Sequence, residues 1–140
     1  MVSFLLDANV VSELRKPVSV AEASVRAWAG RQRPHHLAVS AVTLYELECG
    51  VRRVELRDPA QGDVLRAWLD GQVKPAFAGR VLPLDEGVAV RAASLQVPQP
   101  RPAMDTLIAA TALVHGLVLV TRNVKDFAPT GVRLLNPWEE

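Results

Sequence analysis

The sequence predicts an α/β fold with a mainly parallel central sheet of about four or five short strands. Short apolar runs alternate along the chain with longer segments whose apolar residues recur at helical spacing. This alternation favours parallel strands joined by right-handed helical crossovers. The chain has 140 residues, 49% of them hydrophobic, which suits one domain that folds without disulfides or structural metals. We therefore expect a single domain over residues 1–140.

The first part of the chain predicts a strand followed by two helices. The apolar run at residues 2–6 is typical of a strand that is buried on both faces. A helix is expected at residues 8–15, and Pro17 ends it. Residues 18–32 have apolar positions at helical spacing and precede Pro34, so they predict an amphipathic second helix.

The middle of the chain continues the alternation. Residues 37–39 form a strand candidate, and Ser40 is placed to cap a helix at residues 41–56. Another helical region begins in the polar stretch at residues 57–63 and has apolar positions as far as Val73. The sequence therefore predicts two consecutive helices before the next strand.

A proline-rich loop follows the third predicted strand and its helix. Residues 81–84 predict the strand, Asp85 is placed to cap the helix, and residues 88–95 have a helical pattern. Three prolines at residues 96–104 then break the pattern, which predicts a loop.

The last part of the chain predicts one buried helix and two strands. A helix with Asp105 in its first turn is apolar almost all round, which predicts burial, and Gly116 closes it. Residues 117–120 predict a strand that leads directly into a polar segment beginning at Thr121. Residues 132–135 predict a last short strand.

Composition limits the classes of protein that fit. The net charge is +1, from 16 basic and 15 acidic residues, so any nucleic-acid binding must come from a local patch. Cys49 is the only cysteine, so no intrachain disulfide is expected and the cytoplasm is the simplest location. No apolar run approaches the roughly 20 residues that span a bilayer, and no signal peptide is visible.

Acidic residues stand beside apolar segments at four places in the chain: Asp7, Glu46, Asp105 and Asp126, and the neutral Asn123 accompanies the last of these. Proteins rarely bury carboxylates unless a cation compensates them. In parallel sheets, ligands bind at the carboxyl ends of strands, near a switch in strand order. Asp7 and the segment containing Asn123 each follow a predicted strand, and Asp105 begins the helix that leads into the second of these strands. We expect these positions to share one rim of the sheet.

Each of these residues also has an ordinary structural interpretation. Asp7 suits a helix N-cap, and Asp105 is favourable in the first turn of a helix. Asn123 and Asp126 are residue types that shape turns. Glu46 lies off the apolar stripe of its helix, where a solvated glutamate is expected. The argument for function rests on the combination, because clustered carboxylates without a partner repel one another.

Clustered carboxylates are tolerated when their pKa values are raised, when basic partners are present, or when a hard divalent cation binds their oxygens. The single cysteine and the lack of a CxxC or HExxH arrangement disfavour zinc. Mg²⁺ or Mn²⁺ fits better, because these ions use few protein carboxylates and keep waters, which leaves room for phosphate oxygens and an activated water.

Three blocks of the chain, LLDANVVSEL, VTLYELECGV and MDTLIAATALVHGLVLVTRNVKDF, resemble the PIN-domain ribonucleases, specifically the VapC-like toxins of bacterial toxin–antitoxin modules. The resemblance covers essentially the whole chain and implies a three-layer α/β/α PIN domain. It implies that Asp7, Glu46 and Asp105 are catalytic and hold one or two Mg²⁺ or Mn²⁺ ions. Many relatives have an Asp where this chain has Asn123, so either Asn123 or Asp126 completes the metal site.

The same resemblance implies further roles and partners. Asn9 and Thr121 match polar residues that orient the acidic cluster or the attacking water. The implied reaction is endonucleolytic hydrolysis of RNA phosphodiesters, and the implied partners are an RNA substrate, a cognate antitoxin and a second copy in a homodimer. With 5% aromatic residues, an extensive base-stacking platform is not expected. Basic residues that flank the motifs are candidates for binding RNA phosphates: Arg15, Lys16, Arg52, Arg53, Arg101, Arg122 and Lys125.

Two other classes of function stay open at this point. A catalytically weak PIN-like module would bind a partner through an inert acidic pocket, because a fold alone does not establish function. A metal-dependent nuclease or phosphatase with a non-RNA substrate would use the same carboxylates. A phosphate-binding module of the glycine-rich type is disfavoured, because no glycine-rich loop follows the first predicted strand.

Overall fold

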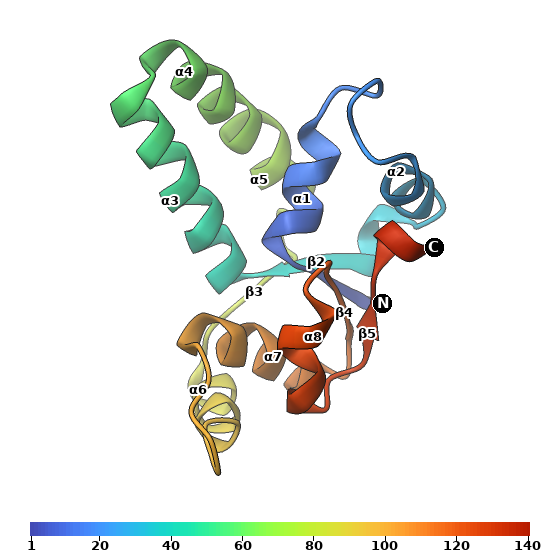
Figure 1. Ribbon diagram of the computed structural model, residues 1–140, viewed down its shortest axis with the longest axis vertical. Helices are drawn as coiled ribbons and strands as arrows, with labels where there is room; N and C mark the ends of the chain where they lie inside the picture. The colour runs from blue at the N-terminus through green and yellow to red at the C-terminus, as the bar shows by residue number, and fades with distance from the viewer.

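The central sheet has five strands, all parallel, in the order β3-β2-β1-β4-β5. The computed structural model describes all 140 residues, and Figure 1 shows the sheet crossing the middle of the molecule. Phe4 of β1 lies opposite Leu37 of β2 on one side and Val118 of β4 on the other, so β1 is the central strand. The predicted parallel α/β fold is confirmed. The strands are β1 (Phe4–Leu6), β2 (Leu37–Ser40), β3 (Val81–Leu82), β4 (Val118–Val120) and β5 (Leu134–Leu135).

Helices cover both faces of the sheet, which gives three layers (Figure 1). One face carries α1 (Ala8–Arg15), α2 (Ala23–Gly30), α3 (Ala41–Arg57), α4 (Pro59–Trp68) and α5 (Lys74–Ala76), and the other carries α6 (Glu86–Ser94), α7 (Ala103–His115) and α8 (Val124–Phe127). Consecutive residues of β1 enter different cores, because strand side chains alternate between faces. Leu6 packs in the core that contains Val10 and Trp28, whereas Leu5 packs in the core that contains Ile108. The expected α/β/α arrangement is therefore present.

Several element boundaries differ from those the sequence predicts. The second helix, expected from residue 18, begins only at Ala23, because the backbone N–H of Glu22 donates to the Glu13 carboxylate and the preceding residues form a turn. The fourth helix begins at Pro59, within the polar stretch where the sequence predicts its start, although Val64 points outward with 58% of its surface exposed. The late start of the second helix is not visible in apolar spacing alone.

Short helical turns also occur where the sequence predicts none. They comprise η1 (Pro34–His36), η3 (Ala128–Thr130) and η4 (Pro137–Glu139), whereas the π turn η2 (Leu69–Val73) lies within the helical region that the sequence predicts as far as Val73. Together with α8, η3 and η4 fold the segment after β4 and the last residues of the chain.

The predicted helix caps are confirmed. The Ser40 hydroxyl accepts a hydrogen bond from the backbone N–H of Val42 at the start of α3, and Asp85 caps α6 in the same way through Val88. Gly116 ends α7 in the left-handed conformation at φ 67°, which a residue with a side chain rarely adopts. Ser40 thus fixes where α3 begins and Gly116 fixes where α7 ends, and both of these helices carry candidate site residues.

The α3–α4 hairpin is held by an ion-pair cluster. Arg66 of α4 pairs with Glu48 at 3.0 Å and with Glu55 at 3.1 Å, and Lys74 lies 2.7 Å from Glu48. Arg66 and Lys74 lower the pKa of Glu48 to about 2. A Cβ atom at Gly62 would lie 2.5 Å from the Glu55 Cα, so this glycine permits the close approach of the two helices. The hairpin thereby orients α3, the helix that carries Glu46.

Candidate functional site

The candidate site lies at the carboxyl ends of β1 and β4, where the order of strands reverses. The chain passes from β1 outward to β2 and β3 and then returns to β4 on the opposite side of β1. Asp7 directly follows β1 and Thr121 directly follows β4, and the Asp7 backbone N–H donates to the Val120 carbonyl at 2.9 Å. Such a reversal is where open parallel sheets bind ligands. The expected shared rim at these two strand ends is present.

Asp7 is the buried centre of the site, with 6% of its surface exposed. Its Oδ1 accepts a hydrogen bond from the Ala8 N–H at 2.9 Å, so the carboxylate does cap α1. Its Oδ2 accepts from the Thr121 hydroxyl at 2.8 Å and from the Asn9 amide at 3.3 Å. Burial raises the pKa of Asp7, and the hydrogen bonds from Thr121, Ala8 and Asn9 oppose that shift. Capping and membership of the carboxylate cluster are therefore compatible roles for Asp7.

Thr121 and Asn9 form the hydrogen-bond network that holds Asp7. Besides donating to Asp7, the Thr121 hydroxyl accepts from the Asn9 amide at 3.3 Å and from the Asn123 backbone N–H at 3.0 Å. The Asn9 side-chain oxygen accepts from the Arg122 backbone N–H at 3.2 Å. Residues from the two ends of the chain are thus joined around one carboxylate, which is the arrangement that an orienting role requires.

Glu46 and Asp105 reach the same region from two helices on opposite faces of the sheet. Burial raises the pKa of Glu46, and the negative charges of Asp7 and Asp105 raise it further. Burial likewise raises the pKa of Asp105, with added effects from Asp126 and Asp7. None of these four carboxylates takes part in a salt bridge, although salt bridges form elsewhere in the chain. The site is therefore a group of like charges without a protein counter-ion.

Asn123 and Asp126 lie at the start and within the first turn of α8, at the solvent-exposed edge of the site. Asn123 occupies the N-cap position, but its side chain makes no capping hydrogen bond. Asp126 is near enough to Asp105 for its charge to raise the Asp105 pKa. Of the two residues, Asp126 is the one that joins the carboxylate group electrostatically.

The chemistry of this donor set fits a hard divalent cation. Carboxylate oxygens without basic partners are the ligands that Mg²⁺ and Mn²⁺ favour. No three acidic, histidine or cysteine side chains lie close enough together to enclose an ion as they stand, so bound waters would have to complete the coordination shell.

The seven basic candidates differ in how they are placed. Three are engaged elsewhere: Lys16 pairs with Glu13 at 2.8 Å, Arg52 pairs with Glu48 at 3.3 Å, and the Arg101 guanidinium donates to the Leu95 carbonyl at 3.0 Å. The other four line hollows that also contain a site carboxylate, and none of them forms a salt bridge. These are Arg15 and Arg53 beside Glu46, and Arg122 and Lys125 beside Asp126.

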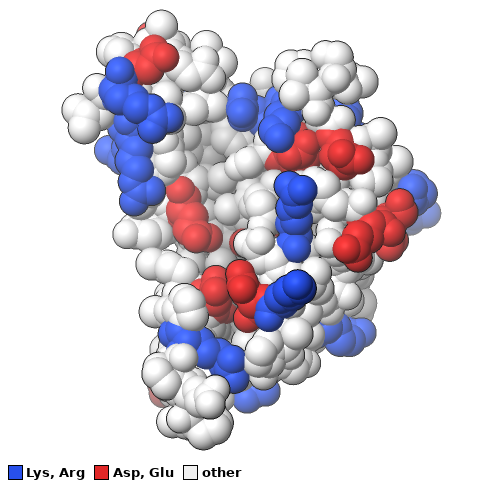
Figure 2. Space-filling view, in the orientation of Figure 1, with Lys and Arg blue, Asp and Glu red and all other residues white.

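The surface shows the same separation of charge. In Figure 2, acidic side chains stand around a hollow in the middle of one face, and basic side chains lie at its margins.

Two of the basic candidates contact tryptophans, which sequence patterns did not reveal. Arg15 lies 5.9 Å from the centre of the Trp68 ring, and Arg122 lies 5.1 Å from the centre of the Trp138 ring. No periodic signal connects these pairs, because each joins residues distant in sequence.

A parallel α/β protein with uncompensated carboxylates at its switch point belongs to a broad class whose sites suit divalent cations and phosphate chemistry. Comparison with known families narrows this class. The family model of the PIN domain matches residues 4–131, so the chain belongs to the PIN domain family.

Two relatives resemble the chain over nearly its full length. It is 36% identical to the VapC ribonuclease Y4jK of Sinorhizobium fredii, covering 96% of this chain and 97% of that protein. It is also 36% identical to toxin FitB of Neisseria gonorrhoeae, covering 97% of this chain and 99% of that toxin. The crystal structure of FitAcB from the same organism superposes with a TM-score of 0.88 at 35% identity, over 98% of this chain and 99% of the matched chain. The resemblance to VapC-like toxins is confirmed.

Proposed function

We propose that this protein is an endoribonuclease that acts as the toxin of a toxin–antitoxin module and depends on Mg²⁺ or Mn²⁺. The observation that carries the proposal is the group formed by Asp7, Glu46, Asp105 and Asp126, which come from four separate elements and lack any protein counter-ion. Relatives called VapC ribonuclease and toxin FitB, each 36% identical, support RNA as the substrate and a toxin as the biological role. We also propose that residues 1–140 form a single PIN domain.

In this proposal Asp7, Glu46 and Asp105 hold the metal ion, and Asp126 completes the site from α8. When bound, Mg²⁺ or Mn²⁺ supplies a water of lowered pKa and stabilises charge on the phosphate. Thr121 and Asn9 keep the Asp7 carboxylate in one orientation through hydrogen bonds of 2.8 Å and 3.3 Å. Hydrolysis adds water across the phosphodiester, which leaves a 5′-phosphate on one product and a 3′-hydroxyl on the other.

The raised pKa values have a consequence for the same residues. Without a cation, Glu46 and Asp105 hold their protons to higher pH than ordinary carboxyl groups, because burial and neighbouring negative charges oppose ionisation. The ionised cluster that binds metal is therefore favoured by rising pH. We expect activity to fall when the medium becomes acidic enough to protonate these groups.

A cognate antitoxin and a homodimer are also part of the proposal. One chain in the structure of a toxin–antitoxin complex from Klebsiella pneumoniae is 26% identical to this chain with a TM-score of 0.68, over 96% of this chain and 98% of that one, and this likeness supports an antitoxin partner. A hollow of about 260 Å³ between α1, α3 and α4, lined by Leu47, Leu65 and Trp68 and bordered by Glu46, suits an amphipathic peptide segment. We assign this hollow to the antitoxin when the toxin is inhibited.

Cleavage of RNA by antitoxin-free protein tests the function. The protein is incubated with mixed RNA in Mg²⁺, Mn²⁺ or EDTA, beside an Asp105→Asn variant and an Asp63→Asn control. Asp63 is an exposed acidic residue on α4, so its change alters the charge equally without touching the site. We expect cutting that EDTA stops, that Asp105→Asn abolishes and that Asp63→Asn preserves.

The rival functions predict different results in the same experiment. Equal cutting by wild type and Asp105→Asn would mean that the site is misplaced. Selective hydrolysis of DNA or of a phosphomonoester would favour the nuclease or phosphatase with a non-RNA substrate. An inert binding module would cut nothing and yet bind a partner protein.

A further inference from the structure

Two arginines beside the carboxylate cluster are each held against a tryptophan instead of an acidic residue. The Arg15 guanidinium lies 5.9 Å from the centre of the Trp68 ring, and the Arg122 guanidinium lies 5.1 Å from the centre of the Trp138 ring. Neither arginine forms a salt bridge, whereas the neighbouring Lys16 is paired at 2.8 Å with Glu13. Their hydrogen-bond donors at the guanidinium edge are therefore free for a ligand.

Each of these arginines shares a hollow with a different carboxylate of the site. Arg15 and Trp68 line the hollow of about 260 Å³ that reaches Glu46. Arg122 lines a second hollow of about 340 Å³ that contains Asp126. Arg15 therefore lies beside the carboxylate carried by α3, and Arg122 lies beside the carboxylate carried by α8.

Hydrogen bonds hold both members of the Arg122–Trp138 pair in place. The Arg122 backbone N–H donates to Asn9 at 3.2 Å, which ties this residue to the network around Asp7. The Trp138 backbone N–H donates to the Asn136 side chain at 2.9 Å, and its carbonyl accepts from the Ser24 hydroxyl at 3.2 Å. The guanidinium is thus placed before any ligand arrives.

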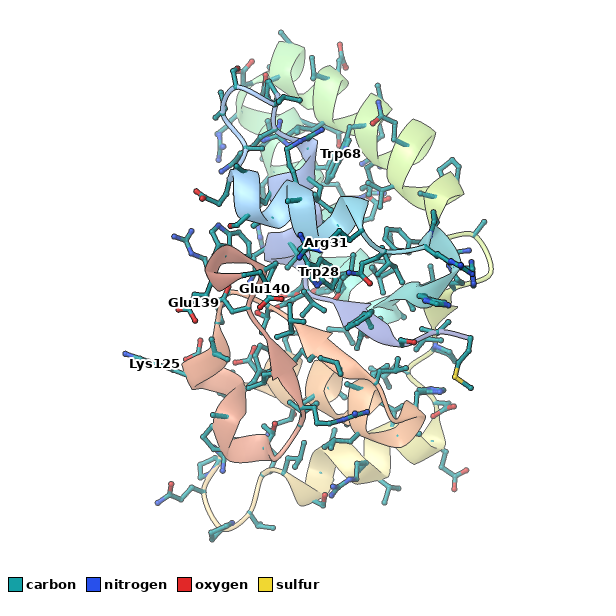
Figure 3. The ribbon with its side chains drawn as sticks, turned by 90° about the vertical axis from the view of Figure 1, so that its right-hand side faces the viewer. Trp28, Arg31, Trp68, Lys125, Glu139 and Glu140 are labelled. Atoms are coloured by element: carbon teal, nitrogen blue, oxygen red, sulfur yellow. The ribbon has the colours of Figure 1, made fainter.

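The second hollow holds charges of both signs. Lys125, Asp126 and Glu139 line it together with Arg122. Figure 3 shows Lys125 and Glu139 projecting toward the same side of the molecule from α8 and the C-terminal turn. Neither acid forms a salt bridge with Arg122, so the arginine remains available to an anion. Trp68, the last residue of α4, is labelled in the same view.

A polyanionic substrate needs cations at this place. RNA phosphates must approach a group of carboxylates that repels them, and a bound metal ion offsets that repulsion only at the centre. A guanidinium held over the face of an aromatic ring keeps its fork of N–H donors, which matches the oxygens of a phosphate. Two such groups, one beside Glu46 and one beside Asp126, would hold the RNA backbone on either side of the bond that is cut.

We propose that Arg15 and Arg122 bind the two RNA phosphates that flank the scissile phosphate, and that Trp68 and Trp138 are positioning residues for the two guanidinium groups. This inference rests on the proposed ribonuclease function. It assigns the path of the RNA strand, which runs from the hollow beside Glu46, across the carboxylates, to the hollow beside Asp126.

Binding of a short fluorescent single-stranded RNA at several salt concentrations tests the path. All variants carry Asp105→Asn, so that the RNA stays intact. Each phosphate that is no longer neutralised should lower the slope of log affinity against log salt by about 0.7. We expect that decrease, together with weaker binding, in both Arg15→Ala and Arg122→Ala. Arg57→Ala removes the same charge from an exposed position at the end of α3 and should leave the slope unchanged.

The tryptophans are tested through their arginines. Trp138→Leu should weaken RNA binding about 2- to 5-fold, the usual contribution of a cation–π contact at a surface, and Trp138→Phe should restore most of it. In an Arg122→Ala background, Trp138→Leu should have no further effect. Trp68 and Arg15 should behave as a pair in the same manner. Thermal unfolding of each variant identifies any loss of binding caused by misfolding, and the Phe variants test the cation–π interaction while an aromatic ring is kept.

Three results would overturn the path. The first is a salt slope that stays unchanged in either arginine variant. The second is an equal loss of RNA affinity on Trp138→Leu with and without Arg122. The third is failure of the Asp105→Asn protein to bind RNA at all. An Arg15→Ala variant that loses antitoxin binding but keeps the wild-type salt slope for RNA counts as the first of these results. RNA cleavage by wild-type protein, prepared in the same way, separates failure of the RNA path from failure of the proposed ribonuclease function. If wild type cuts RNA while the arginine variants bind normally, only the path is wrong, and if wild type cuts no RNA, the proposed function fails as well.

Discussion

The Thr121 hydroxyl is the most connected polar atom of the site, and its removal allows a quantitative prediction. It donates to Asp7 at 2.8 Å and accepts from the Asn123 N–H at 3.0 Å and from the Asn9 amide at 3.3 Å. Thr121→Val preserves the shape and burial of the side chain but removes all three bonds. A hydrogen bond to a charged group contributes about 1.5–3 kcal/mol, and a buried partner left unpaired costs about 1–3 kcal/mol.

We expect Thr121→Val to lower the free energy of unfolding by about 2–3 kcal/mol at neutral pH. Thr121→Ser is the matched control, because it keeps the hydroxyl and loses one methyl group, a change of about 1 kcal/mol. Urea unfolding of the three proteins gives the comparison, provided that the dependence on urea concentration stays the same. Equal stability of the Val and Ser variants would refute the assigned role of the hydroxyl.

The same substitution has a signed pH dependence. Burial raises the pKa of Asp7 and the bond from Thr121 opposes this shift, so losing the bond raises that pKa further. A raised pKa in the folded state means that stability present in acid is lost as pH rises through that pKa. The destabilisation in Thr121→Val should therefore be small in acid and grow toward neutral pH. A difference from wild type that stays constant over this range would contradict the reasoning.

Four further predictions concern the charges and the packing. Asp105→Asn should raise the thermal midpoint by a few degrees at neutral pH, and the gain should vanish in acid, because the raised pKa of Asp105 makes its ionisation unfavourable to folding. Mg²⁺ should raise the midpoint of wild type more than that of Asp105→Asn, with EDTA reversing the effect, since a ligand that binds only the folded state stabilises it by about 1.4 kcal/mol per tenfold excess over its Kd. Asn123→Asp should tighten metal binding measured by calorimetry, and unchanged affinity and cleavage rate would exclude Asn123 as a weak ligand. Gly62→Ala should cost about 1–3 kcal/mol by overpacking, because its Cβ would meet Glu55, whereas Gly50→Ala, with no atom within 4 Å, should be neutral or stabilising in urea unfolding.

The sequence predicted those parts of the fold that depend on local signals. Ser40 caps α3 because a hydroxyl there meets the free N–H groups of the first turn, and this requirement is local. The meeting of Asp7 and Thr121 was also predictable, because strand ends of a parallel sheet share one edge. The partial burial of Glu46 was not predictable from the sequence, because its helix pattern alone favours a solvated side chain. This burial follows from the packing of α3 beside other elements.

Other features had no signal that a pattern could detect. The late start of α2 depends on a contact between Glu13 and Glu22, nine residues apart, which no helical period encodes. α8 has four residues, too few to show a repeat. Trp138 lies in a short turn near the chain end, and its stacking on Arg122 depends on the tertiary fold. The basic candidates could be collected from the sequence, but only the fold separates those that are paired from those that are free.

The placement of β1 at the centre of the sheet has a consequence for when the protein becomes active. Asp7 lies 114 residues before Thr121 in the chain, and Asp105 also comes long after Asp7. β1 therefore has no second neighbour until β4 has been made, and a nascent chain that ends before Thr121 has no assembled site. The order of synthesis thus delays assembly of the carboxylate group until β4 joins the sheet.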